Sequence, residues 1–540
     1  MAGYPFTGSE GIMAQGFDYL IIGGGSAGCV LAARLSEDPA VNVCLLEAGG
    51  GDRNPLYHLP AGFAKMTKGL GSWGWQTVPQ RHMQGRVFNY TQAKVIGGGS
   101  SLNAQIYTRG NAQDYDEWCQ MGCDGWGYED VLPYFRKAED NDTYDNRYHG
   151  KGGPLGVSQP AAPLPICEAY FEAAAALGIP RNHDVNGEQQ DGVAYYQLTQ
   201  RHARRSSAAM AYLAPNLARA NLTVKTGAQV RRIMVAAGRA TGVELMDGTC
   251  LTATTEVILS SGAIGSPRLL QLSGIGPANL LQELGIPVVL DQPQVGENLQ
   301  DHLDLYCISE LSGPYSYDRY AKPHMAALAG LQYLFTRKGP VASSLFETGG
   351  FWYADPDARS PDIQFHLGLG TGIEKGVAAM PQGGVTLNSC YLRPRSRGTV
   401  KLASSDPTQA PLIDPNYLQD PRDREMSIRG LKLTQAIMAQ APLAKYVLAE
   451  RLPGPDVKTD QDYFNFICAH SKTSHHCAGT CRMGVDPGAV VDPRLRVNGI
   501  AGLRVVDNAI MPVVISSNTN AAAIMIGEKA ADMIRADARG

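Results

Sequence analysis

A glycine-rich turn between an apolar segment and a helical segment constrains this chain more than any other feature of its sequence. Gly23, Gly25 and Gly28 have the spacing G-x-G-x-x-G, after the apolar run 17–22 and before the helical periodicity of 29–35. The first glycine permits a tight turn, the second lets the backbone approach a pyrophosphate, and the third brings helix and strand close together. The turn therefore predicts the start of a parallel sheet that binds a dinucleotide.

Glu47 supports the same interpretation. It ends the apolar segment 43–47, 19 residues after Gly28, where a carboxylate can accept a hydrogen bond from a ribose hydroxyl. Ser26 and Ala27 are expected at the N-terminus of the helix, whose positive end favours phosphate. Together these residues predict a dinucleotide site, for either NAD or FAD.

The composition of the 540-residue chain is that of a globular, multidomain protein, with 18% charged and 44% hydrophobic residues. The net charge of -4, without an evident basic cluster, argues against nucleic acid or an anionic membrane surface as a partner. No apolar run is long enough to span a membrane, and the first sixteen residues lack a secretory signal pattern. We therefore expect a cytoplasmic protein, for which peripheral association with a membrane stays open.

The eleven cysteines are scattered along the chain and do not form the dense framework of a disulfide-stapled domain, so we expect a reducing compartment. Cys477 and Cys481, beside His475 and His476, offer four side chains within seven residues. A second ligand cluster elsewhere is missing from the sequence, so we expect no metal site.

Strand and helix patterns predict two domains that are interleaved along the chain. Short strands in 222–245 suggest a small meander that returns to the parallel sheet at 256–260. The alternating segments 363–367 and 385–389, with an amphipathic helix at 424–439, predict an antiparallel sheet with helices on one face.

A strand at 503–507 and a helix at 521–535 are expected to rejoin the first domain. We accordingly predict a nucleotide-binding domain in 14–157, 206–302 and 486–540, and a substrate-binding domain in 158–205 and 303–485.

Further motifs, in 93–103, 262–276, 295–302, 476–484 and 516–520, follow the glycine turn in a fixed order. With that turn, they make the chain resemble the glucose-methanol-choline (GMC) oxidoreductases nearly from end to end. The resemblance implies a Rossmann-like FAD-binding domain with parallel sheet, helices and β-meander, beside a separate substrate domain of antiparallel sheet and helices. It also implies an alcohol substrate and hydride transfer to flavin N5.

The resemblance places the family's catalytic histidine at His476, and its second catalytic position at Asn518. An asparagine cannot accept a proton, which leaves His476 as the single base. A histidine pKa of about 6.5 lies far below that of an alcohol, roughly that of water at about 15.7, so the site must also stabilise the developing alkoxide. The alternative is that His476 is a core histidine and Asn518 caps the helix that begins near Ala521.

The resemblance also suggests which residues contact the cofactor. Besides the glycine turn and Glu47, these are Gly98, Ser100, Asn103, Val230, Asp507 and Asn520. Some family members attach FAD through a histidine at the position of Leu102, which cannot form that bond, so noncovalent FAD is implied.

Substrate candidates are Glu347 and His475. In choline-oxidising relatives the position of Glu347 helps to hold a cationic head group, although a plain buried hydrogen bond would explain it equally well. The pattern looks closest to bacterial dehydrogenases of L-sorbose, polyethylene glycol and choline.

The resemblance therefore predicts an FAD-dependent dehydrogenase that oxidises a primary alcohol, such as a sugar alcohol, sorbose or a glycol, to the aldehyde. A quinone or another non-NAD acceptor would take the electrons. The alternatives are an O₂-using alcohol oxidase on the same scaffold and a choline dehydrogenase. An NAD-dependent enzyme or a flavin-binding protein without activity fits the motifs less well.

Overall fold

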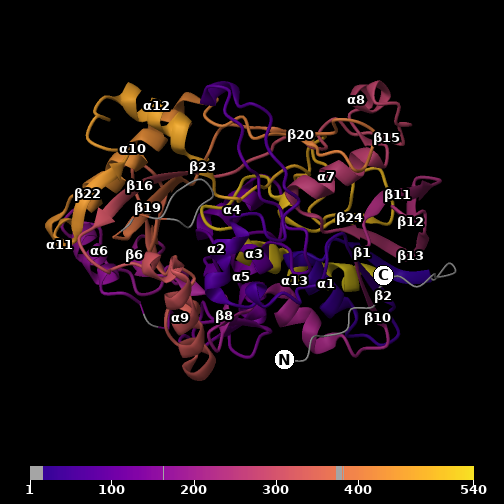
Figure 1. The fold of residues 1–540 in the computed structure, drawn as a ribbon. Coiled ribbons are helices and arrows are strands. Elements are labelled where there is room, and N and C mark those ends of the chain that lie inside the picture. The colour runs from indigo at the N-terminus through magenta and orange to yellow at the C-terminus, as the bar shows by residue number, and fades with distance from the viewer. Residues whose placement is uncertain (1–15, 162, 372–379, 381, 540) are drawn as a thin grey trace.

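The computed structural model describes residues 16–161, 163–371, 380 and 382–539. Two seven-stranded sheets organise them, one at each end of the molecule (Figure 1). The first sheet has the strand order β10 (Leu222–Thr226), β2 (Val43–Glu47), β1 (Gly16–Ile22), β13 (Cys250–Leu259), β12 (Arg239–Leu245) and β11 (Val230–Ala236), and β24 (Leu503–Val505) also pairs with β13.

The first sheet combines a parallel part with an antiparallel meander. β10, β2, β1, β13 and β24 run parallel, whereas β11, β12 and the first residues of β13 pair antiparallel. Leu20, Ile21 and Leu45 are fully buried, as expected for parallel strands that are covered on both faces. One detail differs from the prediction: the strand at 222–226 belongs to the parallel part, where it pairs with β2, and not to the meander.

Helix α1 (Ser26–Leu35) packs against β1 and β2, α13 (Asn520–Ala538) packs against α1, and α5 (Tyr128–Ala138) packs against α13 (Figure 1). α1 and α13 are far apart in sequence and approach closely at Gly527, where a Cβ atom would lie 3.0 Å from the Ala27 carbonyl oxygen. The C-terminal helix therefore completes the domain that the N-terminal strand begins.

The second sheet is antiparallel. Its strand order is β22 (Val447–Leu452), β16 (Leu303–Leu311), β19 (Gly384–Tyr391), β18 (Ile363–Gly368), β17 (Thr348–Trp352) and β6 (Gly192–Tyr195), and β23 (Lys472–Thr473) also pairs with β16. One face packs against α6 (Ile166–Ala175), α10 (Pro421–Met438) and α11 (Ala441–Ala444).

Strict alternation along β18 divides its side chains between the two faces. Ile363, Phe365 and Leu367 pack in the core beneath the helices, so Gln364 and His366 point to the other face because successive side chains of a strand alternate. That polar face is the one turned towards the first domain, since His366 lines the cavity described below.

The predicted fold class is confirmed, with a Rossmann-like FAD-binding part and a sheet-based substrate part. The strands of each sheet fall inside the predicted segments, while the exact domain boundaries stay a prediction. Within the ranges that the structure describes, no helix is long and apolar enough to cross a membrane.

Short elements fill the connections. The segment 49–110 contains η1 (Pro55–Tyr57), η2 (Pro60–Gly62), α2 (Phe63–Met66), η3 (Arg81–Met83), α3 (Gly99–Leu102) and β3 (Ile106–Tyr107). Elsewhere lie α4 (Ala112–Gln120), β4 (Glu139–Asn141), β5 (Leu155–Val157), β7 (Gln197–Leu198), β8 (Gln200–Arg201), β9 (Arg204–Arg205), α7 (Gly262–Leu272), β14 (Ile275–Gly276), α8 (Ala278–Glu283), β15 (Leu290–Asp291), η6 (Asp318–Ala321), α9 (Pro323–Thr336), η7 (Pro340–Ala342), β20 (Thr399–Lys401), β21 (Leu412–Asp414) and α12 (Asp460–His470).

Candidate active site

A cavity of about 360 Å³ connects the two sheets. At one end its wall contains Gly23 and Glu47, and at the other it contains His476, Asn518 and His366. The cavity therefore joins the glycine turn at the N-terminus to the predicted catalytic pair near the C-terminus.

At Gly23 and Gly28 the glycine turn leaves no room for a side chain. Gly23 has φ +104°, and a Cβ atom there would lie 2.4 Å from the Ser260 carbonyl oxygen. A Cβ atom on Gly28 would lie 2.0 Å from the Gly23 carbonyl oxygen. Gly28 itself does not line the cavity, which fits its expected task of bringing helix and strand together. Gly25, Ser26 and Ala27 do line it.

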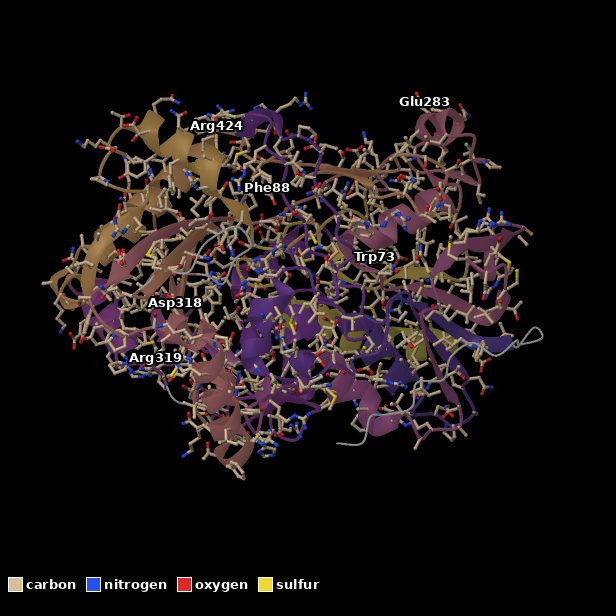
Figure 2. All side chains as sticks on the ribbon, viewed as in Figure 1. Trp73, Phe88, Glu283, Asp318, Arg319 and Arg424 are labelled. Carbon is tan, nitrogen blue, oxygen red and sulfur yellow. The ribbon has the colours of Figure 1, made fainter. Side chains whose placement is uncertain are left out.

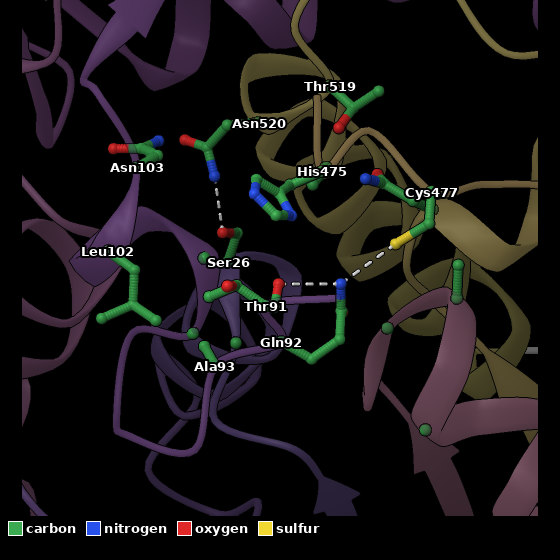
Figure 3. A pocket seen from close by; sticks show the side chains of 18 of the residues that line it. Ser26, Thr91, Gln92, Ala93, Leu102, Asn103, His475, Cys477, Thr519 and Asn520 are labelled. Carbon is green, nitrogen blue, oxygen red and sulfur yellow. Dashed lines mark hydrogen bonds between the residues drawn. The ribbon is translucent and has the colours of Figure 1, made fainter. Parts of the chain in front are cut away.

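The start of α1 is suited to a pyrophosphate. Gly25 is its N-cap, and its first turn contains no acidic residue, so the positive end of the helix dipole faces the cavity uncompensated. Asn520, the first residue of α13, donates a hydrogen bond from Nδ2 to the Ser26 Oγ at 2.7 Å (Figure 3). The beginnings of the N-terminal and C-terminal helices thus meet at one point of the cavity wall.

Glu47 is held in place by the backbone. Its Oε2 accepts from the Gly24 amide at 2.9 Å and its Oε1 from the Gly49 amide at 2.7 Å. Burial raises the pKa of this carboxyl, and the two amides act in the opposite direction. Each oxygen keeps a lone pair for a further donor, so the carboxylate can bind ribose hydroxyls as predicted for an FAD site.

Asp507 is held similarly. Its Oδ2 accepts from the Gly262 amide at 2.9 Å and from the Ser266 hydroxyl at 2.6 Å, and its side chain lines the cavity. Val230, Gly98, Asn103 and Leu102 also line the cavity.

Ser100, like Gly28, is a predicted cofactor contact that the structure does not bring to the cavity wall. Its hydroxyl donates to the Gly97 carbonyl oxygen at 2.5 Å and accepts from the Ala208 amide at 2.9 Å. These two hydrogen bonds hold the Ser100 hydroxyl in the turn before Asn103, outside the cavity wall.

His476 is buried and is fixed through its backbone. Its amide donates to the Asp301 Oδ1 at 2.8 Å. The other oxygen of Asp301 accepts hydrogen bonds from three hydroxyls, those of Tyr90, Tyr417 and Thr473. The imidazole is thus presented by a segment that several distant elements hold rigid.

A chain of hydrogen bonds determines which ring nitrogen of His476 carries the proton. The His302 Nε2 lies 3.1 Å from the Leu392 carbonyl oxygen, which can only accept, so this nitrogen is the donor. Burial lowers the pKa of His302 to about 4, so the ring is neutral and its Nδ1 is an acceptor. The His476 Nδ1, at 3.0 Å, therefore donates, and the His476 Nε2 carries a free lone pair.

The hydrogen bonds of Asn518, on the other side of the imidazole, indicate the same tautomer of His476. Its Oδ1 accepts from the Gln364 Nε2 at 2.8 Å and from the Thr108 hydroxyl at 3.1 Å. This orientation turns its Nδ2 donor towards the His476 Nε2, at 3.0 Å. The two chains of hydrogen bonds agree that Nε2 is the basic nitrogen and that it faces an amide donor.

Asn518 does not cap the C-terminal helix. The N-cap of α13 is Thr519, whose side chain makes no capping hydrogen bond. The capping alternative for Asn518 is therefore wrong, because its amide is fully engaged with Thr108, Gln364 and His476.

The surroundings keep the imidazoles neutral. Burial lowers the pKa of His476 well below 6.5, and His302, His366, His475 and Lys472 add to this effect. For His366 the pKa falls to about 3, mainly through burial. His476 can therefore accept a proton at every pH at which the protein is expected to work.

The two substrate candidates lie in different places. His475 lines the cavity with a left-handed backbone, φ +60° (Figure 3). Glu347 does not line the cavity; its carboxyl lies near Ser343 and Tyr317, where burial raises its pKa to about 7. The structure thus joins His475, but not Glu347, to the predicted catalytic pair.

Several site residues escaped the sequence reasoning. The partners that orient the predicted catalytic pair are Thr108, Asp301, His302 and Gln364. Two features of the sequence point to three of them. Asp301 and His302 end the motif 295–302, and Gln364 occupies a polar position in the alternating segment 363–367. Thr108 had no such signal.

The sulfur of Cys477 lies beside the predicted catalytic pair and has a side-chain partner. The Cys477 Sγ accepts from the Gln92 Nε2 at 3.4 Å (Figure 3). Among the residues that the structure describes, no group of three His, Cys, Asp or Glu side chains could hold a metal ion.

Comparison with known proteins gives a consistent result. Sequence profiles of the GMC oxidoreductases match residues 17–304 and 394–527. The chain is 42% identical to an alcohol dehydrogenase [acceptor] of Pseudomonas putida, covering 96% of this chain and 95% of that protein. It is also 42% identical to the mitochondrial choline dehydrogenase of Homo sapiens, covering 96% and 90%. The crystal structure of pyridoxine 4-oxidase from Mesorbium loti superposes with a TM-score of 0.88, at 34% identity over 96% of this chain and 99% of the other.

Proposed function

Because the chain belongs to the GMC oxidoreductase family and is an FAD-dependent enzyme that oxidises alcohols, we propose that His476 is its catalytic base. The observation that carries this proposal is the proton-free Nε2 of His476, which faces the Asn518 amide at 3.0 Å in the wall of the cavity.

Bound FAD supplies the oxidised ring that accepts a hydride from the alcohol carbon. The His476 Nε2 removes the hydroxyl proton, and the Asn518 Nδ2 turns its hydrogen bond from Nε2 to the alcohol oxygen as negative charge develops there. A positioned base contributes about 10² to 10⁴ in rate, and a donor to the oxygen about 10² to 10³. Thr108 and Gln364 keep that donor from rotating away.

FAD is held without a covalent bond in this proposal. Leu102 lies in the cavity wall and has no atom that could attach to the ring. The cradle of Gly23, the start of α1, Glu47 and Asp507 supplies the contacts instead.

The substrate we favour is a neutral primary alcohol. Asp304 lines the cavity, but its carboxylate lies 3.4 Å from the Lys472 ammonium, and Glu347 lies outside the wall. A quaternary ammonium group would therefore meet a positive charge beside the carboxylate, which disfavours choline. The rings of Phe63 and Phe346 meet edge to face, with their centroids 5.9 Å apart. They give the cavity an apolar wall suited to the carbon chain of an alcohol.

We further propose that electrons leave to a quinone or a similar non-NAD acceptor, and that the protein works in the cytoplasm at a membrane surface. The alcohol dehydrogenase [acceptor] of Pseudomonas putida supports the first part. All eleven cysteines are free thiols, which suits a reducing compartment.

Anaerobic mixing with a panel of alcohols tests the proposal. We expect aliphatic or glycol-type primary alcohols to bleach the yellow colour of bound FAD faster than choline does, and denaturation to release all of the FAD. Admission of O₂ should restore the colour slowly, and a quinone should restore it rapidly. Rapid reoxidation by O₂ would identify an oxidase, and failure of every alcohol to bleach the flavin would overturn the proposed chemistry.

A further inference from the structure

Helix α9 (Pro323–Thr336) carries its largest apolar side chains on the outside. Leu328, Leu331, Leu334 and Phe335 are 59%, 53%, 57% and 81% exposed. These four residues, which we call the α9 face, recur at the spacing of one helix side. A helix of a globular protein normally turns such a side inwards, so a cluster of this kind marks an interaction surface.

The inner side of α9 is held to the protein by only two buried residues of the helix. Ala329 and Tyr333 are its buried residues, and the Tyr333 hydroxyl donates to the Ala203 carbonyl oxygen at 2.9 Å. The helix projects from the body of the molecule (Figure 1). The orientation is thus fixed by Tyr333, and the α9 face is held away from the protein core.

Positive charge flanks α9 in the chain, before and after the helix. Arg319 (Figure 2) and Lys322 precede the helix and Arg337 and Lys338 follow it, whereas the segment 319–340 contains no acidic residue. All four cations are exposed. The segment 319–340 is therefore positively charged, whereas the whole chain has a net charge of -4. The surface around α9 suits an anionic membrane, although the overall composition of the chain does not.

We propose that the α9 face docks on the surface of an anionic phospholipid bilayer. Its apolar side chains would enter the boundary between headgroups and acyl chains, and the four cations would contact the anionic headgroups. A second copy of the chain is a poorer occupant, because both copies would bring only positive charge to the contact.

The position of α9 connects this surface to the active site. α9 packs against η7 (Pro340–Ala342), and η7 packs against η2 (Pro60–Gly62). η2 leads directly into α2, whose Phe63 and Met66 line the cavity. Docking would therefore bring the cavity wall near the membrane, where a lipid-soluble quinone resides; this consequence rests on the proposed function.

Co-sedimentation with vesicles tests the proposal on the FAD-loaded, full-length protein. We expect binding to vesicles of phosphatidylglycerol and phosphatidylcholine in equal parts, and weaker binding to pure phosphatidylcholine. The double variant Leu331→Gln/Phe335→Gln should bind the mixed vesicles at least about tenfold more weakly. Arg337→Gln/Lys338→Gln should lose most of the preference for phosphatidylglycerol.

Leu448→Gln is the matched control, because Leu448 on β22 is 58% exposed and lies outside the α9 face. It should bind as the unsubstituted protein does. Binding that the α9 variants leave unchanged, or no binding to either vesicle, would overturn the proposal. So would a dimer in sedimentation velocity that Leu331→Gln/Phe335→Gln dissociates, since the face would then belong to a second copy.

Alcohol-driven bleaching of FAD in the absence of vesicles separates this proposal from the proposed function. The α9 variants should bleach at the rate of the unsubstituted protein. If the unsubstituted protein fails to bleach but binds vesicles through α9, the proposed function is wrong and the docking surface stands.

Discussion

The two ends of the cavity are built in different ways. At the nucleotide end, backbone atoms form the site. The backbone packs closely at Gly23 and Gly28, α1 begins at the cavity wall, and two backbone amides hold Glu47. At the reaction end, the site is formed by hydrogen bonds between side chains, those of Thr108, His302, Gln364, His476 and Asn518.

This difference teaches that binding and chemistry can fail separately. A backbone cradle is disturbed by an added atom, whereas a network of side chains is disturbed by a lost hydrogen bond. Substitutions at the two ends should therefore change different measured quantities: the amount of bound FAD at one end, and the rate per bound FAD at the other.

The largest expected effect on rate comes from His476→Ala. Without the base, the first-turnover rate of anaerobic flavin bleaching should fall about 10² to 10⁴-fold, while bound FAD per chain stays unchanged. Stopped-flow absorbance and the FAD content after denaturation measure both quantities. A rate within tenfold of the unsubstituted protein would remove His476 from the role of base.

Asn518→Ala should come next. Loss of the donor to the alcohol oxygen is expected to reduce the bleaching rate about 10² to 10³-fold. Asn518→Asp should be no better, because a carboxylate would face the developing negative charge. If Asn518→Asp proved nearly as fast as the unsubstituted protein, donation by Asn518 would not be what stabilises the oxygen.

His302→Phe should have a smaller effect on rate, acting through the tautomer of His476. A buried N–H without an acceptor costs about 1 to 3 kcal/mol, which corresponds to roughly a fivefold to 150-fold loss of rate. The alternative tautomer would place the proton on Nε2.

The pH profile distinguishes this role from a structural one. Because burial holds the pKa of His476 well below 6.5, the unsubstituted protein should keep its rate as pH falls through 6.5. His302→Phe should show a changed profile, and His302→Gln, which offers an acceptor oxygen, should recover part of the rate. Equal pH profiles for all three proteins would contradict the role of His302 in setting the tautomer of His476.

Glu347→Gln should have the smallest effect on rate, and it should act on stability instead. The unfolded chain loses this proton near pH 4.5, whereas the folded protein keeps it up to about pH 7, so stability falls as pH rises through that window. The substitution should stabilise the protein by on the order of 3 kcal/mol at pH 8 and by little at pH 4. Urea titrations at both pH values measure this; equal shifts would show that ionisation of Glu347 is not the cause.

Much of the nucleotide end could be predicted from the sequence, because its determinants are local. Gly23, Gly25 and Gly28 lie within one turn, and Glu47 lies at the end of the next strand. Such spacing is fixed by strand and helix geometry. The alternation in 363–367 was equally informative for the second sheet.

The reaction end could be predicted only in part, because its geometry is tertiary. The resemblance to a family placed His476 and Asn518, but nothing local links Thr108 to a residue 410 positions later. The strand at 222–226 shows the same limit, since its apolar pattern fits the parallel part and the meander equally well. Ser100 lies in a motif that the resemblance links to the cofactor, but its hydroxyl bonds to the Gly97 carbonyl oxygen and to the distant Ala208 amide, which the local sequence does not reveal.

One measurement tests the separation of the two ends most directly: the bleaching rate per bound FAD, plotted against bound FAD per chain, for Gly23→Ala and His476→Ala. Because a Cβ atom at Gly23 would lie 2.4 Å from the Ser260 carbonyl oxygen, Gly23→Ala should lose most of its FAD, yet each FAD that remains should be bleached at nearly the unsubstituted rate. His476→Ala should keep its FAD and bleach it at least about a hundredfold more slowly. If both variants instead lost rate and FAD together, the two ends would act as one unit, and the separation of cofactor binding from chemistry would be contradicted.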